Sequence, residues 1–132
     1  MVIHPSAITA ILFHEADAAR FAEAIERDPV RLLSAVSLVE TAMSAETRLG
    51  EEGSRGLDLF LLEAAVQVMP VSREQADIAR HAFHFYGKSR HAAALSVLDC
   101  FAYALARTSG EPLLYKGESF ERTDVKCVPV GG

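Results

Sequence analysis

Residues 96–117 read SVLDCFAYALARTSGEPLLYKG, and this stretch decides the fold. Its first part has the features of an apolar helix, because most of its residues are apolar and Gly110 is the residue type that commonly ends a helix. An apolar run of strand type follows at once. The stretch therefore predicts a helix over 96–110 and a strand over 111–117, which together are the repeating unit of α/β proteins.

The same alternation runs through the rest of the chain. Apolar runs of strand type cover 1–3, 30–37, 66–71 and 125–130, and helical patterns cover 7–13, 15–28, 38–49, 57–65 and 72–87. The expected N-caps are Ser6, Ser37 and Ser72, a helix is expected to end at Gly87, turns are expected over 51–56 and 118–124, and a loop over 88–95. This order predicts a single α/β domain over 1–132, with a largely parallel sheet and helices on both faces.

Composition excludes several classes of protein. No apolar segment approaches the ~18 uninterrupted residues of a membrane span, and the N-terminus lacks the basic and apolar regions of a signal peptide. Cys100 and Cys127 form neither a disulfide framework nor a zinc motif, so a reducing cytoplasm is expected. The net charge of −5 argues against a general nucleic-acid binder. The charge is −7 over residues 1–79 and +2 over 80–132, so an anionic ligand is expected at the C-terminal part.

Several polar side chains follow the predicted strands, at the edge of a parallel sheet where ligands bind. His4 directly follows the first strand, Glu40 lies early in the helix after the second, and Asp99 lies near the start of the most apolar helix. Glu118, with Asp124, follows the strand at 111–117. If these acids converge, a divalent cation would relieve their repulsion, and oxygen ligands suit Mg²⁺ or Mn²⁺ better than zinc.

Each acid also has a purely structural interpretation. Glu40 at the third position after Ser37 could close a capping box, and Asp99 could be an exposed acid of a first helical turn. Glu118 in a turn could be simply solvated. The residues alone leave these alternatives open.

The motifs taken together resemble the VapC-type toxins of the PIN-domain ribonuclease family. The resemblance rests on MVI-x-x-SAI at the N-terminus, SAVSLVETAM over 34–43, and RHAAALSVLDCFAYALARTSGEPLLYKGESFERTDV over 90–125. It implies a PIN-like three-layer α/β/α fold with a central, mainly parallel sheet. It further implies a cytoplasmic, Mg²⁺- or Mn²⁺-dependent endoribonuclease that acts on RNA, forms a homodimer and is inhibited by a VapB-like antitoxin.

The resemblance also assigns roles to residues. Glu40 and Asp99 match the second and third acids of the family, and Glu118 is the nearest carboxylate to the expected fourth acid, near Gly117. Ser6 matches a polar residue close to the acids. The implied catalytic residues are thus Glu40, Asp99, Ser6 and Glu118, the implied metal ligands are His4, Asp99 and Glu40, and the candidates for RNA phosphate contacts are Lys88, Arg90, Lys116 and Arg122. Ser96 and Leu98 depart from the family's Asn and Gly.

The main departure is His4, which stands where the family has its first catalytic Asp. Imidazole is a poor ligand for Mg²⁺ and a tolerable one for Mn²⁺ or Zn²⁺, so the first hypothesis is an impaired ribonuclease. A site tuned to another metal is the rival hypothesis. A neutral, buried His4 hydrogen-bonded to Ser6 or to a carboxylate agrees with either. The alternative class is an inactive PIN-like module that retains only antitoxin or partner binding.

Overall fold

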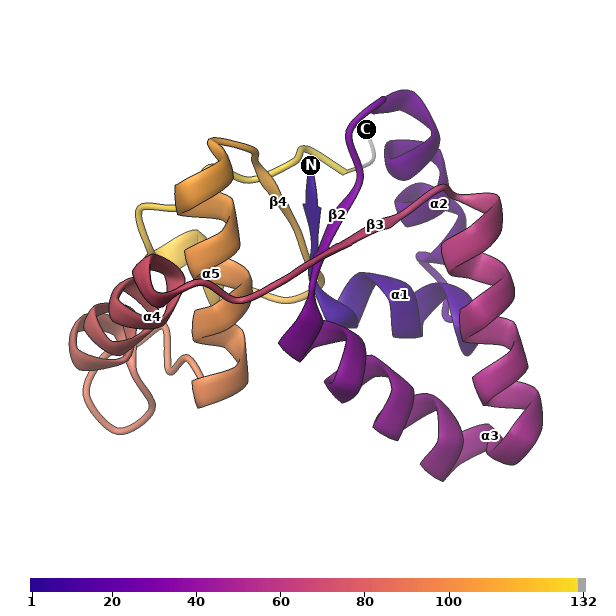
Figure 1. Cartoon of the computed structure of the whole chain (residues 1–132), viewed down its shortest axis with the longest axis horizontal. Helices are drawn as coiled ribbons and strands as arrows, with labels where there is room; N and C mark the ends of the chain where they lie inside the picture. The colour runs from indigo at the N-terminus through magenta and orange to yellow at the C-terminus, as the bar shows by residue number, and fades with distance from the viewer. Residues whose placement is uncertain (131–132) are drawn as a thin grey trace.

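The computed structural model describes residues 1–130 and consists of a four-stranded sheet covered by five α-helices (Figure 1). The strands are β1 (Val2–Ile3), β2 (Leu32–Ser34), β3 (Gln67–Met69) and β4 (Leu113–Leu114), all parallel and in the order β3-β2-β1-β4. The helices are α1 (Pro5–Leu12), α2 (Ala18–Arg27), α3 (Ala35–Glu63), α4 (Arg73–Tyr86) and α5 (Val97–Ser109), and a short 3₁₀-helix, η1, covers Phe120–Arg122. The predicted α/β fold with a parallel sheet is confirmed.

The sheet separates two hydrophobic cores, because successive side chains of a strand point to opposite faces. Val2, Leu32 and Leu113 pack with α4 and α5 on one face. Their sequence neighbours Ile3, Leu33 and Leu114 pack with α1, α2 and part of α3 on the other face. Figure 1 shows the same arrangement, with α4 and α5 on one side of the strands and α1, α2 and α3 on the other. These are the three layers that the family resemblance implies.

Two of the expected helix caps are wrong. Helix α1 begins one residue after β1, so His4 rather than Ser6 is its N-cap. Helix α3 likewise begins directly after β2, and its N-cap is Ser34 rather than Ser37. In both cases the helix begins as soon as the strand ends, before the Ser residue that was expected to cap it. The other caps are confirmed: Ser72 accepts a hydrogen bond from the Gln75 backbone N–H, and Gly110 ends α5 in the left-handed conformation.

Two connections also differ from expectation. The strand predicted over 125–130 is reduced to an isolated parallel bridge, in which Cys127 pairs with Leu113 at the edge of the sheet. The turn predicted over 51–56 occurs earlier, at Gly50, where α3 changes direction between two helical segments, and residues 131–132 of the predicted domain lie outside the described residues. Within residues 1–130, no helix combines the length and the apolar character that crossing a bilayer requires.

Two glycines allow the sharp change of direction within α3. At Gly50 the helix kinks, with φ 62° and ψ −142°, a backbone conformation that is essentially open only to glycine. Beyond the kink Gly53 is buried, and a Cβ atom there would lie 2.1 Å from the Ala45 carbonyl oxygen. The two halves of α3 can approach this closely because position 53 has no side chain.

This contact predicts opposite effects for two neighbouring glycines. Gly53→Ala should lower the free energy of unfolding by about 1–3 kcal/mol, because the new methyl group overlaps backbone atoms. Gly56→Ala is the matched control, since its Cβ would meet only the Leu12 Cδ2 atom at 3.7 Å and the substitution raises helix propensity. Urea denaturation of both variants measures the difference. Equal stability of the two variants would contradict the proposed close approach.

Candidate active site

His4 lies at the carboxyl end of β1 and is 9% exposed. Its backbone is extended and its Nδ1 atom accepts a hydrogen bond from the Ser6 backbone N–H at 3.0 Å, which makes it the N-cap of α1. The Ser6 Oγ atom lies 2.7 Å from the same nitrogen and accepts a hydrogen bond from the Lys116 backbone N–H at 2.8 Å. The ring is therefore fixed by groups from α1 and from the segment that follows β4.

The other ring nitrogen of His4 contacts Asp99. The Nε2 atom lies 2.7 Å from Asp99 Oδ1. Because Nδ1 accepts from a backbone N–H, the proton of the neutral ring is on Nε2, and the ring donates to the carboxylate. Both nitrogens are thus engaged within the protein, and neither offers a free lone pair to a metal.

Asp99 has a structural role as well as a position in the site. It is the third residue of α5, and its Oδ2 atom accepts a hydrogen bond from the Ser96 backbone N–H while Ser96 Oγ accepts from the Asp99 N–H. This reciprocal pair is a capping box. Burial raises the pKa of Asp99, but the hydrogen bonds from His4 and Ser96 outweigh burial, so the pKa lies below its ordinary value.

Glu40 is the other acid of the site. Since α3 begins at Ala35, Glu40 is in its second turn and does not close a capping box. Its Oε1 atom is buried and has no hydrogen-bond partner among the described residues. Burial raises the pKa of Glu40; the nearby His4 opposes this increase and Asp99 adds to it. Glu40 is therefore a carboxylate whose charge is poorly compensated by the protein itself.

The fit of a divalent cation can be tested on these side chains. Glu40 and Asp99 supply the oxygen donors that Mg²⁺ and Mn²⁺ prefer, and the unpartnered Glu40 Oε1 is the kind of atom that a cation would satisfy. His4 does not fit as a third ligand, because its Nε2–H points at Asp99. Between residues 1 and 130, no three His, Cys, Asp or Glu side chains form a group that could hold a metal ion. The residues fit a cation held by two carboxylates and completed by water or substrate oxygens.

The structure does not bring the remaining expected residues into this group. Glu118 is exposed and makes no hydrogen bond or ion pair with the other described residues. The Lys116 ammonium lies 2.6 Å from Glu15 Oε1 and 3.1 Å from Asp17 Oδ1, which neutralise its charge. Lys88, Arg90 and Arg122 are exposed on the surface. Lys116 is connected to the site by its backbone N–H, which donates a hydrogen bond to Ser6 Oγ.

Sequence reasoning missed two contributors to the site. The Ser96 hydroxyl and backbone hold Asp99 in place, and the S-x-x-D spacing of a capping box was available to indicate this. Phe120 packs edge-on against the His4 ring, with centroids 5.2 Å apart. No motif in the sequence pointed to this aromatic contact, which depends on the path of the chain after β4.

Comparison with known proteins places these features in a family. The PIN domain family matches residues 1–126. The chain is 52% identical over 128 residues to ribonuclease VapC30 of Mycobacterium tuberculosis, covering 97% of this chain and 98% of the relative. It is also 52% identical over 128 residues to ribonuclease VapC of Mycolicibacterium smegmatis, covering 97% and 99%.

Solved structures show the same fold at low sequence identity. VapC20 of Mycobacterium tuberculosis, described as a sarcin–ricin loop cleaving toxin, superposes with a TM-score of 0.81 at 16% identity and 98% coverage of both chains. VapBC2 from Rickettsia felis, solved with a DNA fragment from its promoter, gives a TM-score of 0.71 at 15% identity, with 98% coverage of both chains. These superpositions confirm the fold.

The pKa shifts predict opposite effects for the two acids in the presence of a chelator. Glu40→Gln should raise the free energy of unfolding at neutral pH, because it removes a buried charge that the fold disfavours. This gain should shrink as the pH falls through the raised pKa of Glu40, where the wild-type carboxyl becomes neutral.

Asp99→Asn should instead lower the free energy of unfolding at neutral pH, by about 1.5–3 kcal/mol, because His4 and Ser96 lose a charged acceptor. That loss should shrink as the pH falls through the lowered pKa of Asp99. Urea denaturation at several pH values measures both variants. A stabilising Asp99→Asn or a destabilising Glu40→Gln would contradict this account of the site.

Proposed function

The chain belongs to the PIN-domain family, in its VapC branch of toxin ribonucleases, and we propose that it is a metal-dependent endoribonuclease toxin whose catalysis is weakened by His4. The observation that carries this proposal is the pair of acids near the strand ends, in which Glu40 has a buried, unpartnered Oε1 and Asp99 accepts a 2.7 Å hydrogen bond from His4 Nε2. The acids of the site lie near the strand ends, and the His4 imidazole is hydrogen-bonded to one of these acids, Asp99.

The two carboxylates are proposed to hold the cation, which is Mg²⁺ or Mn²⁺. Glu40 contributes the unpartnered Oε1 atom, and Asp99 contributes Oδ1. When bound, such a cation lowers the pKa of a coordinated water and neutralises charge on phosphate oxygens. Ser6 and Ser96 act indirectly, since they position His4 and Asp99 by hydrogen bonds. Glu118 keeps its proposed catalytic role only if substrate or a partner draws it toward the acids.

His4 weakens this arrangement in two ways. It supplies no negative charge where an Asp would, so the site attracts a cation less strongly. It also donates a hydrogen bond to the Asp99 oxygen that a cation would need. A cation must therefore displace a short hydrogen bond, and each ~1.4 kcal/mol of lost stabilisation lowers the rate tenfold.

Partners follow from the same family. The solved neighbours include VapBC2 of Rickettsia felis and a toxin–antitoxin complex from Klebsiella pneumoniae, which support a VapB-like antitoxin as partner. The relatives named as ribonucleases support RNA as the substrate. We further propose a homodimer that acts in the cytoplasm. Lys88, Arg90 and Arg122 stay candidates for RNA phosphate contacts, whereas Lys116 is a weaker one because Glu15 and Asp17 already pair with its ammonium.

A second candidate function is a PIN-like module that binds antitoxin or another partner without catalysis. The His4–Asp99 hydrogen bond favours this second function, because it satisfies one oxygen of the Asp99 carboxylate without any metal. The two candidates differ in whether Glu40 and Asp99 bind a divalent cation.

Cleavage of RNA by position-4 variants tests the enzyme proposal. His4→Asp should raise the rate with Mg²⁺ or Mn²⁺ by about 100-fold or more, because it restores a charged oxygen ligand. The fold should be retained, since Asp is a favourable N-cap. His4→Asn is the matched control: it also caps α1 and releases Asp99, but it adds no charge. If His4→Asp gains no activity, or no more than His4→Asn, the proposed role of His4 is wrong.

Calorimetric titration with Mn²⁺ separates the enzyme from the binding module. The wild-type chain should bind Mn²⁺ weakly and His4→Asp at least about tenfold more tightly, because a carboxylate replaces a neutral ring. Glu40→Gln should abolish the binding. Absence of Mn²⁺ binding in all three proteins would favour the non-catalytic module.

A further inference from the structure

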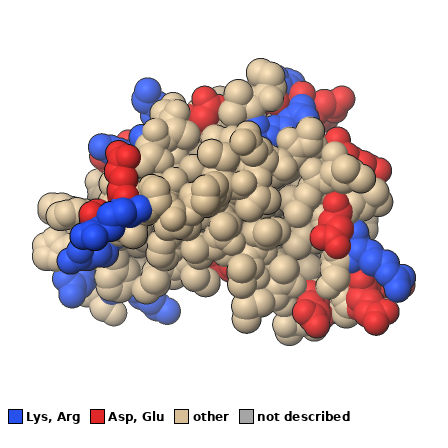
Figure 2. Space-filling view, viewed as in Figure 1, with Lys and Arg blue, Asp and Glu red and all other residues tan. Residues whose placement is uncertain are grey.

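Phe85 is an exposed aromatic side chain in the most basic part of the chain. It lies near the end of α4 and its residue surface is 64% exposed. Residues 80–98 contain three Lys and Arg, three His and no Asp or Glu. Figure 2 shows Lys and Arg side chains at the end of the molecule where α4 lies, with acidic side chains among them, and Asp77 of α4 pairs with Arg73 and Arg80. A large apolar ring held in water within such a segment indicates a binding surface for an anion that carries flat apolar groups.

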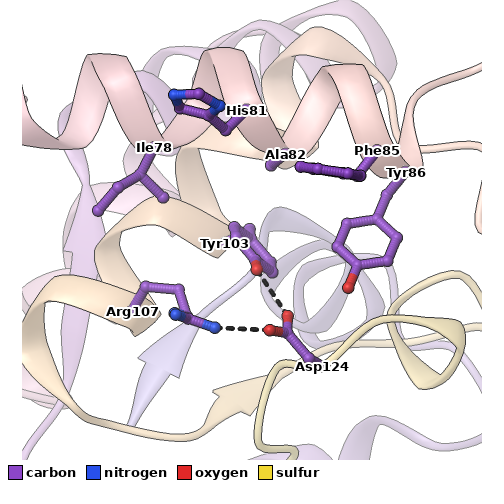
Figure 3. A pocket seen from close by; sticks show the side chains of 8 residues that line it. All are labelled: Ile78, His81, Ala82, Phe85, Tyr86, Tyr103, Arg107 and Asp124. Atoms are coloured by element: carbon purple, nitrogen blue, oxygen red, sulfur yellow. Dashed lines mark hydrogen bonds and ion pairs between the residues drawn. The ribbon is translucent and has the colours of Figure 1, made fainter.

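Phe85 lines two hollows of the surface. One, of about 380 Å³, lies between α4 and α5 and is lined by His81, Phe85, Tyr86, Tyr103, Arg107 and Asp124, among others (Figure 3). The second, of about 570 Å³, is lined by Arg80, His81, His84 and Phe85. Phe85 and His81 thus line both hollows, whose arginines are paired within the protein, Arg80 with Asp77 and Arg107 with Asp124.

The first hollow has polar groups at its base and aromatic groups at its wall. Asp124 accepts hydrogen bonds from the Tyr103 hydroxyl and from Arg107, both at 2.6 Å, which fixes the carboxylate (Figure 3). A carboxylate oxygen can accept a further hydrogen bond, and Arg107 has further N–H donors. Fixed donors and acceptors beside aromatic rings match the edge and the face of an unstacked nucleobase.

Two elements connect this hollow with the acids of the site. On α5, Asp99, Tyr103 and Arg107 are spaced by four residues, so they follow one another along one side of the helix at about 6 Å intervals. After β4, Phe120 packs against His4 while Asp124 contacts Tyr103 and Arg107. The hollow therefore lies about two helical turns along α5 from Asp99, a span on the order of 12 Å.

We propose that Phe85 is a stacking platform for single-stranded RNA, and that the hollow beside Asp124 and Arg107 takes an unstacked base of the substrate. This inference rests on the proposed ribonuclease function and names a base-binding surface outside the acid site. RNA is favoured over a protein partner because Lys88 and Arg90 supply charges for phosphates in the segment that carries the aromatic ring, whereas Arg80 already pairs with Asp77.

Binding of a fluorescent single-stranded RNA oligonucleotide, followed by anisotropy in the presence of a chelator, tests the platform without cleavage. Phe85→Ala should weaken binding about 5- to 150-fold, the range expected for loss of one base–aromatic stack. Phe85→Trp should retain binding, because stacking needs only a flat aromatic face. Leu62→Ala is the matched control, since Leu62 is 77% exposed on α3.

The salt dependence of RNA binding distinguishes the contribution of base stacking from that of phosphate contacts. Phe85→Ala should leave the slope of log K against log salt concentration unchanged. Lys88→Gln should weaken binding and reduce that slope by about 0.7, as expected for loss of one phosphate contact to a single strand. Sedimentation velocity of each variant records whether the oligomeric state changes.

The outcomes are distinguishable. If the wild type binds RNA and Phe85→Ala binds as well as Leu62→Ala, the platform is wrong and the ribonuclease proposal stands. If Phe85→Ala changes the oligomeric state with unchanged RNA affinity, the face is an interface between protein chains and the inference is overturned. If the wild type binds no RNA, the proposed function itself fails and the platform fails with it.

Discussion

The hydrogen bond between His4 and Asp99 is the interaction on which the site depends. One ring nitrogen of His4 caps α1 and the other contacts the first turn of α5, while Ser6 connects the ring to the backbone after β4. The imidazole therefore joins three segments that a parallel sheet brings to one edge. In an all-carboxylate site these segments would repel one another, and a cation would be needed to hold them together.

The order of helices and strands could be predicted from the sequence, because each face of the sheet requires its own periodic pattern of apolar residues. Caps and turns were less predictable. Ser6 and Ser37 are favourable cap residues, but His4 and Ser34 lie directly at strand ends and take the role first. Glu51 to Gly56 has the composition of a turn, but the chain turns at Gly50, and Gly53 packs against Ala45 across that turn. That contact is tertiary and leaves no local signal.

The candidate site was predictable to the extent that it lies at strand ends. The strand-end rule selected His4, Glu40 and Asp99, and the pKa shifts of the two acids reflect the proximity of all three side chains. The position of Glu118 outside this group could not be predicted, because it follows a two-residue strand and a glycine, so its direction is set by the loop and not by the sheet. The pairing of the Lys116 ammonium could not be predicted either, because its partners, Glu15 and Asp17, are distant in sequence.

Family membership and catalytic competence are separable properties of this chain. The first depends on the packing of two apolar cores against a sheet, which position 4 scarcely affects, since both Asp and His can cap α1. In the proposed function, catalytic competence depends instead on the charge that residue 4 supplies to the site. Replacing a carboxylate by a neutral ring that donates to Asp99 preserves the geometry of the strand ends while removing one charge that would attract a cation. The features that identify the family can therefore all be present in a chain whose chemistry is weakened at a single atom pair.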